Sequence, residues 1–365
     1  MKEKILVYPF DRHFLPIMRY HFLPNEWVIT HLVSPGGWGI DGNDAGSIDF
    51  GSPLHIEIEA DFLACLSDCD GVFFTQSERK IDFEKFLLPK ILRSIEAGKN
   101  IYTNIELFKE SYAQIKDLCS KNNVSFDYYS NNLDEYSINL NNSIALELSA
   151  PVISVMGLIE GLNKFETQVL LHKFLLEKGY NSLLLTSRSY GSLGKCYSVP
   201  SFMFSKKMSE PDKIIALKHF VKDLEIKTNP DVIILGVPGG LLPFDNINHN
   251  NFGITAFEIT RAIKPDATLL CAYTENFSSE YWDYIRSICK FRFSSDLTAC
   301  IRTNALLIFS GLGSPDESKF MIYDPKEKQY PLEETEFPIF EADHSLSAYD
   351  CVLNSLAENA ESESF

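Results

Sequence analysis

The sequence contains no stretch of about eighteen apolar residues of the kind that spans a bilayer. Its first eight residues lack the apolar run and the cleavage site of a signal peptide, so we expect a cytoplasmic protein with no membrane partner. Basic residues are also in deficit, because 33 Lys and Arg stand against 50 Asp and Glu, for a formal net charge of −17. This charge repels the phosphates of DNA and RNA, so a nucleic-acid partner is not expected either.

Motifs for metal binding and for nucleophilic catalysis are missing as well. The eight cysteines include no Cys-x-x-Cys pair and no spacing typical of a zinc ion or an iron–sulfur cluster, so we expect reduced, mostly buried thiols and no metal site. Cys65 and Cys69 are spaced to share a helix face, but two sulfurs alone do not make a metal site. No Gly-x-Ser-x-Gly elbow and no His-Glu-x-x-His is present. No residue is therefore assigned a catalytic role.

The composition is that of a globular chain with two cores. Apolar residues make up 45% and charged residues 23%, which separates the chain from disordered proteins. Its 365 residues exceed the size at which a single core keeps growing. Short apolar runs alternate with amphipathic helical patterns in both halves, which predicts parallel sheets covered by helices. The expected fold class is therefore α/β, beginning with a Rossmann-like parallel-sheet domain.

The expected domain boundaries follow from changes in composition. The first alternating pattern fills residues 1–130, and a stretch rich in Asn, Ser and Asp at 131–148 favours turns, so we place a linker there. The second alternating pattern fills residues 149–330. Residues 331–365 form an acidic C-terminal segment without Lys or Arg. Such a segment is typical of a solvated tail, and the alternative is docking onto a basic partner.

The most specific motif is a strand, a glycine-containing loop and a lysine that starts a helix. The strand is expected at 151–156, the loop at 157–163 and the helix at 164–178. In a P-loop, backbone N–H groups and the lysine ammonium surround phosphate groups. We therefore expect a P-loop NTPase-like doubly wound α/β domain that binds ATP, GTP or another phosphate ligand through Lys164. The alternative is that Gly157 and Gly161 only permit a turn and that Lys164 is solvated.

Departures from the P-loop pattern affect the metal ion. Asn163 replaces the glycine before the lysine, and Phe165 replaces the Ser or Thr whose hydroxyl binds Mg²⁺. Glu160 adds a negative charge that repels a triphosphate. Asp231 lies at the start of its predicted strand, and Glu275 follows the next strand as the nearest substitute. Mg²⁺ binding and hydrolysis as an ATPase or GTPase are therefore left open.

Loops beyond the carboxyl ends of parallel strands supply the candidate ligand contacts. In the second domain the candidates are Gly157, Gly161, Asn163, Lys164, Phe165, Glu166, Thr167, Arg188, Gly239 and Gly240. Arg188 can meet a phosphate or pair with a carboxylate, and the glycines can equally be turn residues. A candidate ligand loop of the first domain consists of Asp11, Arg12, His13, Gly36, Gly37, Trp38 and Gly39.

Over nearly its whole length the chain resembles a bacterial family of peptide maturation system proteins. Four separate strings carry the resemblance: Val7-Tyr8-Pro9-Phe10-Asp11, Val33-Ser34-Pro35-Gly36-Gly37-Trp38-Gly39, Asn163-Lys164-Phe165-Glu166 and Pro230-Asp231-Val232-Ile233-Ile234-Leu235-Gly236-Val237-Pro238-Gly239-Gly240. More distantly, the second domain is similar to P-loop ATPases and GTPases that assemble metallocofactors and partition cargo.

The resemblance implies an accessory protein in the maturation of a ribosomally synthesised, modified peptide, with the precursor peptide and a radical-SAM enzyme as partners. It supplies no reaction and no catalytic residue. One hypothesis is that a nucleotide at the variant loop drives conformational work on a partner. The alternative is a non-catalytic scaffold, a pseudo-NTPase, that binds the precursor peptide or the modifying enzyme. A third hypothesis makes the first domain the enzyme, with a cofactor on the loop at 36–39.

Overall fold

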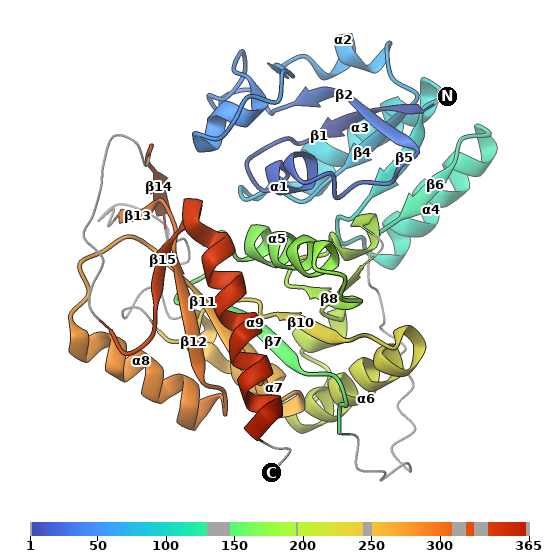
Figure 1. Ribbon diagram of the computed structural model, residues 1–365. Coiled ribbons are helices and arrows are strands. Elements are labelled where there is room, and N and C mark those ends of the chain that lie inside the picture. Colours follow the sequence, from blue (N-terminus) through green and yellow to red (C-terminus); the bar gives the residue numbers. More distant parts are fainter. Residues whose placement is uncertain are drawn as a thin grey trace. The chain divides into compact units, whose positions relative to one another are not determined.

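The computed structural model describes residues 2–129, 147–194, 196–243, 250–308, 319–324 and 335–362. The chain divides into two compact units, one of Met1–Ser130 with Ser192–Lys195 and one of Asn131–Gly191 with Cys196–Phe365. Each unit has its own parallel sheet (Figure 1). Apart from residues 147 and 148, the linker expected at 131–148 lies outside the described residues.

The sheet of the first unit has six strands in the order β3-β2-β1-β4-β5-β6, and all neighbours are parallel. Its strands are β1 (Glu3–Tyr8), β2 (Trp27–Val33), β3 (Ile58–Glu59), β4 (Gly71–Phe74), β5 (Asn100–Thr103) and β6 (Phe126–Tyr128). Its helices are α1 (Leu15–Arg19), α2 (Phe62–Leu66), α3 (Leu88–Glu96) and α4 (Lys109–Lys121). This is the strand order of a Rossmann sheet, so the expected Rossmann-like domain is confirmed.

The sheet of the second unit has seven parallel strands in the order β15-β12-β11-β7-β10-β8-β9. They are β7 (Val152–Gly157), β8 (Ser182–Thr186), β9 (Tyr197–Ser198), β10 (Val232–Gly236), β11 (Ala267–Ala272), β12 (Leu297–Arg302) and β15 (Ile339–Glu341). A separate antiparallel pair joins β13 (Ala305–Ile308) to β14 (Lys319–Ile322). All six residues of β7 are buried, as expected for the middle strand of a sheet covered on both faces.

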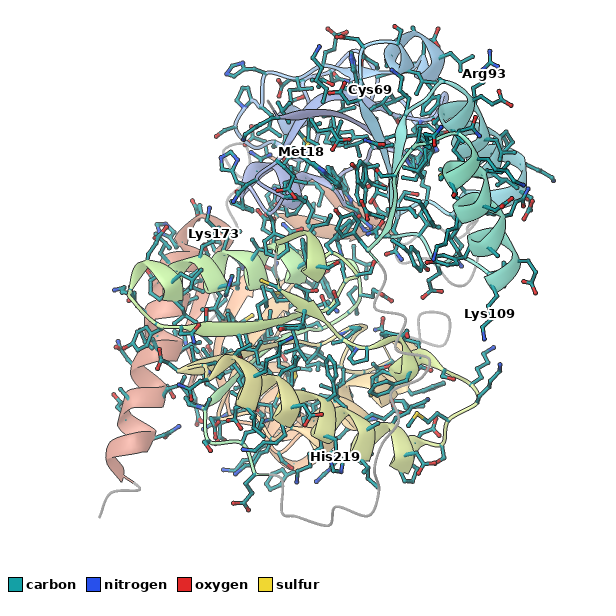
Figure 2. All side chains as sticks on the ribbon, turned by 90° about the vertical axis from the view of Figure 1, so that its right-hand side faces the viewer. Met18, Cys69, Arg93, Lys109, Lys173 and His219 are labelled. Carbon is teal, nitrogen blue, oxygen red and sulfur yellow. The ribbon has the colours of Figure 1, made fainter. Side chains whose placement is uncertain are left out.

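Helices cover both faces of the second sheet. They are α5 (Lys164–Glu177), α6 (Glu210–Thr228), α7 (Ile254–Ala262), α8 (Ser279–Arg292) and α9 (Ser345–Ser362). Right-handed crossovers place α5 on the face opposite α6 and α7, because the chain moves along the sheet in opposite directions in these crossovers. Figure 2 shows this arrangement, with Lys173 marking α5 and His219 marking α6. The expected doubly wound α/β fold is thus confirmed. None of the helices in the described part of the chain has the length and apolar character to cross a membrane.

The C-terminal segment belongs to the second sheet. β15 pairs with β12, and α9 contacts β11, β12 and α5. The α9 residues Ala348, Tyr349 and Val352 have buried side chains. The expectation of a solvated tail is therefore wrong for residues 339–359, because these apolar positions recur on one helix face among the acidic residues that suggested a tail. Residues 331–334 and 363–365 lie outside the described residues.

Candidate functional site

The loop after β7 lies at the carboxyl edge of the second sheet. The chain leaves β7 toward β8 but leaves the adjacent β11 toward β12, on the other side. Ligands of open α/β sheets bind at such a switch point. Backbone hydrogen bonds fix the loop there, from Leu158 N to Cys271 O (3.0 Å) and from Leu241 N to Gly157 O (3.1 Å). The loop therefore has the position of a ligand-binding loop.

Lys164 is the first residue of α5, and its side chain folds back over the end of β7. The residue is only 5% exposed, and Nζ donates a hydrogen bond to the carbonyl oxygen of Gly239. Gly157 makes room for it, because a Cβ at position 157 would lie 2.7 Å from Lys164 Cδ. Burial lowers the pKa of Lys164 to about 8; Glu160 opposes this effect and Arg188 adds to it. The alternative of a solvated Lys164 is therefore wrong.

Five consecutive backbone N–H groups of the loop, from Ile159 to Asn163, donate no hydrogen bond to any residue in the described part of the chain. Gly161 has φ = +88°, a conformation that glycine adopts readily and that turns the loop toward α5. The N-terminus of α5 follows directly and adds a partial positive charge. Unpaired amides beside a helix N-terminus and a lysine ammonium are the features that bind phosphate groups.

Phe165 occupies the position where a P-loop carries its metal-binding hydroxyl. Its ring is 1% exposed and packs 5.6 Å from the ring of Tyr190. The guanidinium carbon of Arg188 lies over the same ring, 5.5 Å from its centroid. The structure thus brings Arg188 to the helix start that also carries Lys164. At this position the site has an aromatic ring and a second cation instead of a metal ligand.

The hydroxyl of Thr167 is used inside the fold. Thr167 Oγ1 donates to the carbonyl oxygen of Asn163 (3.0 Å), and the Cys271 thiol lies 3.5 Å from the same Oγ1. Thr167 is 4% exposed. The first turn of α5 also contains Glu166, which is partly buried. These contacts fix the start of α5 and use the Thr167 hydroxyl inside the fold.

The candidate metal-binding carboxylates lie at the opposite end of the sheet or are exposed. Asp231 accepts a hydrogen bond from Asn181 N (2.7 Å) at the amino end of β10, opposite the ligand edge. Glu275, after β11, and Glu160, inside the loop, are both exposed. The arrangement therefore favours an anionic ligand over a protein-bound metal ion.

The loop after β10 closes over the site. Gly239 has φ = +77°, and its carbonyl oxygen receives the Lys164 ammonium. Gly240 lies so close to the loop that a Cβ there would be 2.8 Å from Ile159 Cα. Both glycines thus meet requirements of conformation and close approach next to Lys164.

Gln168 and Ser187 belong to the same edge and were not among the expected residues. Gln168 is completely buried, its Oε1 accepts a hydrogen bond from Ser187 N (3.0 Å), and its Nε2 donates to Ser187 Oγ (3.0 Å). This contact needs Gly236, where a Cβ would lie 2.3 Å from Gln168 Oε1. The signal in the sequence is a glutamine on the buried face of an apolar helix, together with a glycine that ends a strand. Both residues hold the Arg188 segment against α5.

In the first unit, Asp11 connects the loops that follow β1 and β4. Its carboxylate accepts hydrogen bonds from His13 N (2.8 Å) and Glu78 N (2.6 Å). Arg12 Nε donates to the Glu78 carboxylate at 2.7 Å. These loops lie at the switch point of the Rossmann sheet, so the candidates Asp11, Arg12 and His13 are at its ligand edge.

The glycine loop after β2 reaches the same segment. Trp38 lies under the guanidinium of Arg79, 5.5 Å from Cζ to the ring centroid. Gly37 (φ = +87°) and Gly39 (φ = +75°) provide the turn, whereas Gly36 has an ordinary φ and open space around it. The two groups of first-unit candidates therefore meet around residues 78–79.

Comparison with known proteins supports the fold. No protein-family model and no curated protein matches the sequence. Among solved structures, a DUF1611 family protein from Anabaena variabilis is similar with a TM-score of 0.59 and 12% identity, over 82% of this chain and 88% of that chain. At this identity the likeness shows a shared fold.

Shorter matches are weaker. The signal recognition particle receptor FtsY from Elizabethkingia anophelis in complex with GDP has a TM-score of 0.28 and 18% identity, over 43% of this chain and 50% of that chain. Cobyrinic acid a,c-diamide synthase from Mycobacterium smegmatis, with bound ADP and magnesium, has a TM-score of 0.28 and 14% identity, over 42% of this chain and 74% of that chain. The DUF1611 match and the two observed parallel sheets together support an α/β fold over most of the chain.

Proposed function

We propose that the second domain binds the phosphate groups of a nucleotide at the loop from Gly157 to Lys164. The observation that carries the proposal is the row of five unpaired amides beside the buried ammonium of Lys164. In the described part of the chain, no carboxylate forms an ion pair with Lys164. A buried charge without an anionic partner is unfavourable, so a phosphate group would supply the missing partner.

Arg188 extends the proposed site to two cations. Its guanidinium lies over Phe165, at the helix start that carries Lys164, and its charge contributes to the lowered pKa of Lys164. A phosphate group bound near both side chains would be attracted by both positive charges. We therefore expect binding of ATP or GTP to require little help from Mg²⁺.

The residues of the loop support nucleotide binding better than they support nucleotide hydrolysis. Phe165 is buried between Tyr190 and Arg188 and provides no metal-binding hydroxyl. Glu160 adds a negative charge to the loop. These two residues favour a second candidate function, a pseudo-NTPase scaffold that holds its ligand without turning it over.

The biological setting that we propose is the maturation of a ribosomally synthesised, modified peptide. It rests on the four sequence strings through which the chain resembles peptide maturation system proteins, and the partners would be the precursor peptide and a radical-SAM enzyme. In this setting nucleotide binding would control a partner's conformation, whereas a scaffold would bind the peptide regardless of nucleotide. A pulldown of the precursor peptide with and without ATP distinguishes these two roles.

Calorimetric titration tests the phosphate site itself. ATP and GTP are titrated with and without Mg²⁺ into the wild-type protein, into Lys164→Met and into Lys227→Met, an exposed lysine at the end of α6. We expect binding to wild type and to Lys227→Met, and loss of binding in Lys164→Met. Heat that is absent for both nucleotides, or unchanged in Lys164→Met, contradicts the proposal.

A further inference from the structure

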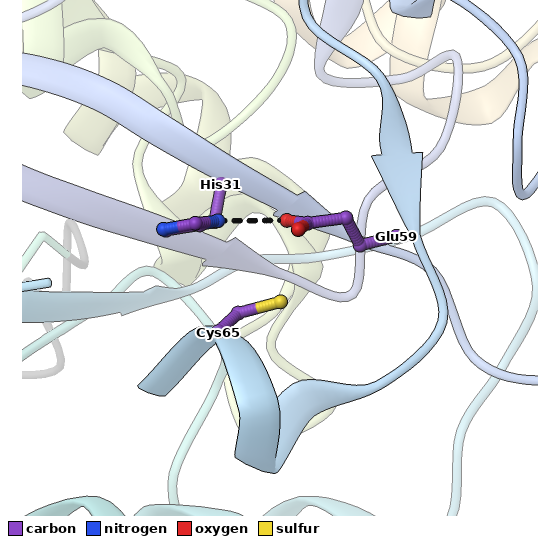
Figure 3. Close-up of side chains that lie close together, drawn as sticks. All are labelled: His31, Glu59 and Cys65. Atoms are coloured by element: carbon purple, nitrogen blue, oxygen red, sulfur yellow. Dashed lines mark hydrogen bonds and ion pairs between the residues drawn. The ribbon is translucent and has the colours of Figure 1, made fainter. Parts of the chain in front are cut away.

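A group of potential metal ligands lies in the first unit, whereas the phosphate loop belongs to the second. His31 comes from β2, Glu59 from β3 and Cys65 from α2 (Figure 3). One ligand atom from each residue lies within 4.8 Å of those of the other two. The His31 and Glu59 side chains point toward each other, and the Cys65 thiol points into the same space.

The three elements are held in place independently of any ion. Val33 pairs with Glu59 in the parallel ladder between β2 and β3, which fixes the position of Glu59 relative to β2. The α2 helix is capped by Asp61, whose carboxylate accepts hydrogen bonds from Leu63 N (3.0 Å) and Ala64 N (3.1 Å). Ligand atoms around a tetrahedral zinc ion lie roughly 3.3–3.8 Å apart, which small side-chain rotations can reach from the observed separations.

The hydrogen bonding of His31 points to a ligand at its Nδ1 atom. Nδ1 lies 2.8 Å from a Glu59 carboxylate oxygen, so these two potential ligand atoms already face each other. Nε2 is buried without a hydrogen-bond partner in the described part of the chain. An Asp68 carboxylate oxygen lies 3.7 Å from Nε2, beyond normal hydrogen-bond distance.

A neutral imidazole that binds a metal ion through Nδ1 carries its proton on Nε2, where the Asp68 carboxylate can accept a hydrogen bond from it. Histidine ligands in metal sites typically donate their other N–H to a carboxylate in this way, which fixes the ring and strengthens its binding. The same ion would receive the Glu59 carboxylate and the Cys65 sulfur as anionic ligands. Asp68 is thus a positioning residue, already held by Lys4 at 2.8 Å.

We propose that His31, Glu59 and Cys65 bind one divalent ion of the zinc class, with Asp68 orienting the imidazole. A nitrogen, a sulfur and a carboxylate oxygen suit zinc or cobalt and do not suit Mg²⁺ or Ca²⁺, which prefer oxygen ligands. Three protein ligands leave the fourth tetrahedral position open to water or to a small ligand. The spacing of residues 31, 59 and 65 follows no metal-binding motif, which is why the sequence predicted no metal site.

The experiment is a Co²⁺ titration of the full-length protein after treatment with a chelator. Binding through Cys65 gives a sulfur-to-cobalt charge-transfer band in the near ultraviolet that saturates at one Co²⁺ per chain and that Zn²⁺ removes by competition. We expect the band to disappear in Cys65→Ser and to persist in Cys69→Ser, a matched change of a buried thiol four residues away. Asp68→Asn should weaken binding by about 10-fold or more without removing the band.

Two results of the Co²⁺ titration overturn the proposal. The first is the absence of a saturable charge-transfer band in the wild-type protein, and the second is a band that persists in Cys65→Ser. X-ray absorption of the zinc-loaded wild-type protein tests the same ligand set without any substitution. It should show one sulfur with nitrogen and oxygen ligands, and a spectrum with oxygen ligands alone would contradict the assignment.

Discussion

Lys164→Met should make the protein more stable at neutral pH while removing phosphate binding. Methionine is about as long as lysine and apolar, so it can fill the space over Gly157 without a buried charge. The pKa of Lys164 is about 8 in the folded chain, against 10.5 for an exposed lysine. At about 1.36 kcal/mol per pH unit, this difference corresponds to ~3 kcal/mol of cost for the buried ammonium at pH 7.

Part of this gain is offset, because the substitution leaves the carbonyl oxygen of Gly239 without the hydrogen bond from Lys164 Nζ. A lost hydrogen bond of this kind costs about 1 kcal/mol. We therefore expect the free energy of unfolding of the second unit to rise by about 1–3 kcal/mol at pH 7. Urea denaturation followed by circular dichroism measures this, with Lys227→Met as the control that should change little.

The pH dependence gives an independent check with a definite sign. Between about pH 8 and 10.5 the unfolded chain holds a proton on Lys164 that the folded chain has released, so wild-type stability gains from rising pH in this window. The difference between Lys164→Met and wild type should therefore shrink as the pH rises from 8 to 10.5. The reasoning is refuted if the variant is less stable than wild type at pH 7, or if the difference is independent of pH.

Three further predictions concern the same fold. The affinity for phosphate or nucleotide should be constant below about pH 8 and fall by up to about 10-fold per pH unit above it. The reason is that the neutral amine of Lys164 no longer attracts an anion. Calorimetry across pH 7–10 measures this affinity. Gly157→Ala should lower the free energy of unfolding by about 1–3 kcal/mol and weaken nucleotide binding, because the new Cβ would lie 2.7 Å from Lys164 Cδ. Gly36→Ala is the control, because a Cβ there has open space and should leave stability nearly unchanged. Equal effects of the two substitutions on stability would contradict this reasoning. Glu341→Gln should lower the free energy of unfolding of the second unit by about 2 kcal/mol, because it removes the negative charge that pairs with Arg302, a residue only 1% exposed. An unchanged denaturation midpoint would show that this pair contributes nothing to stability.

The sequence by itself determined the local elements and the fold class. Short apolar runs such as the one at Val152–Gly157 are typical of strands in a covered parallel sheet, and the amphipathic stretches between them form the covering helices. The position of Lys164 at a helix start was also readable, because strand, glycine loop and helix are adjacent along the chain. The sequence also shows directly that Phe165, the residue after Lys164, has no hydroxyl to bind Mg²⁺.

Only the tertiary structure decided what these groups contact. It buried Lys164 over Gly157, placed Arg188 on the Phe165 ring, and turned the acidic C-terminal segment into a strand and a covering helix. It also brought together His31 and Glu59, which are 28 residues apart. Such contacts depend on the register of strands and on packing between distant segments, and the short-range periodicity of a sequence carries no information about either.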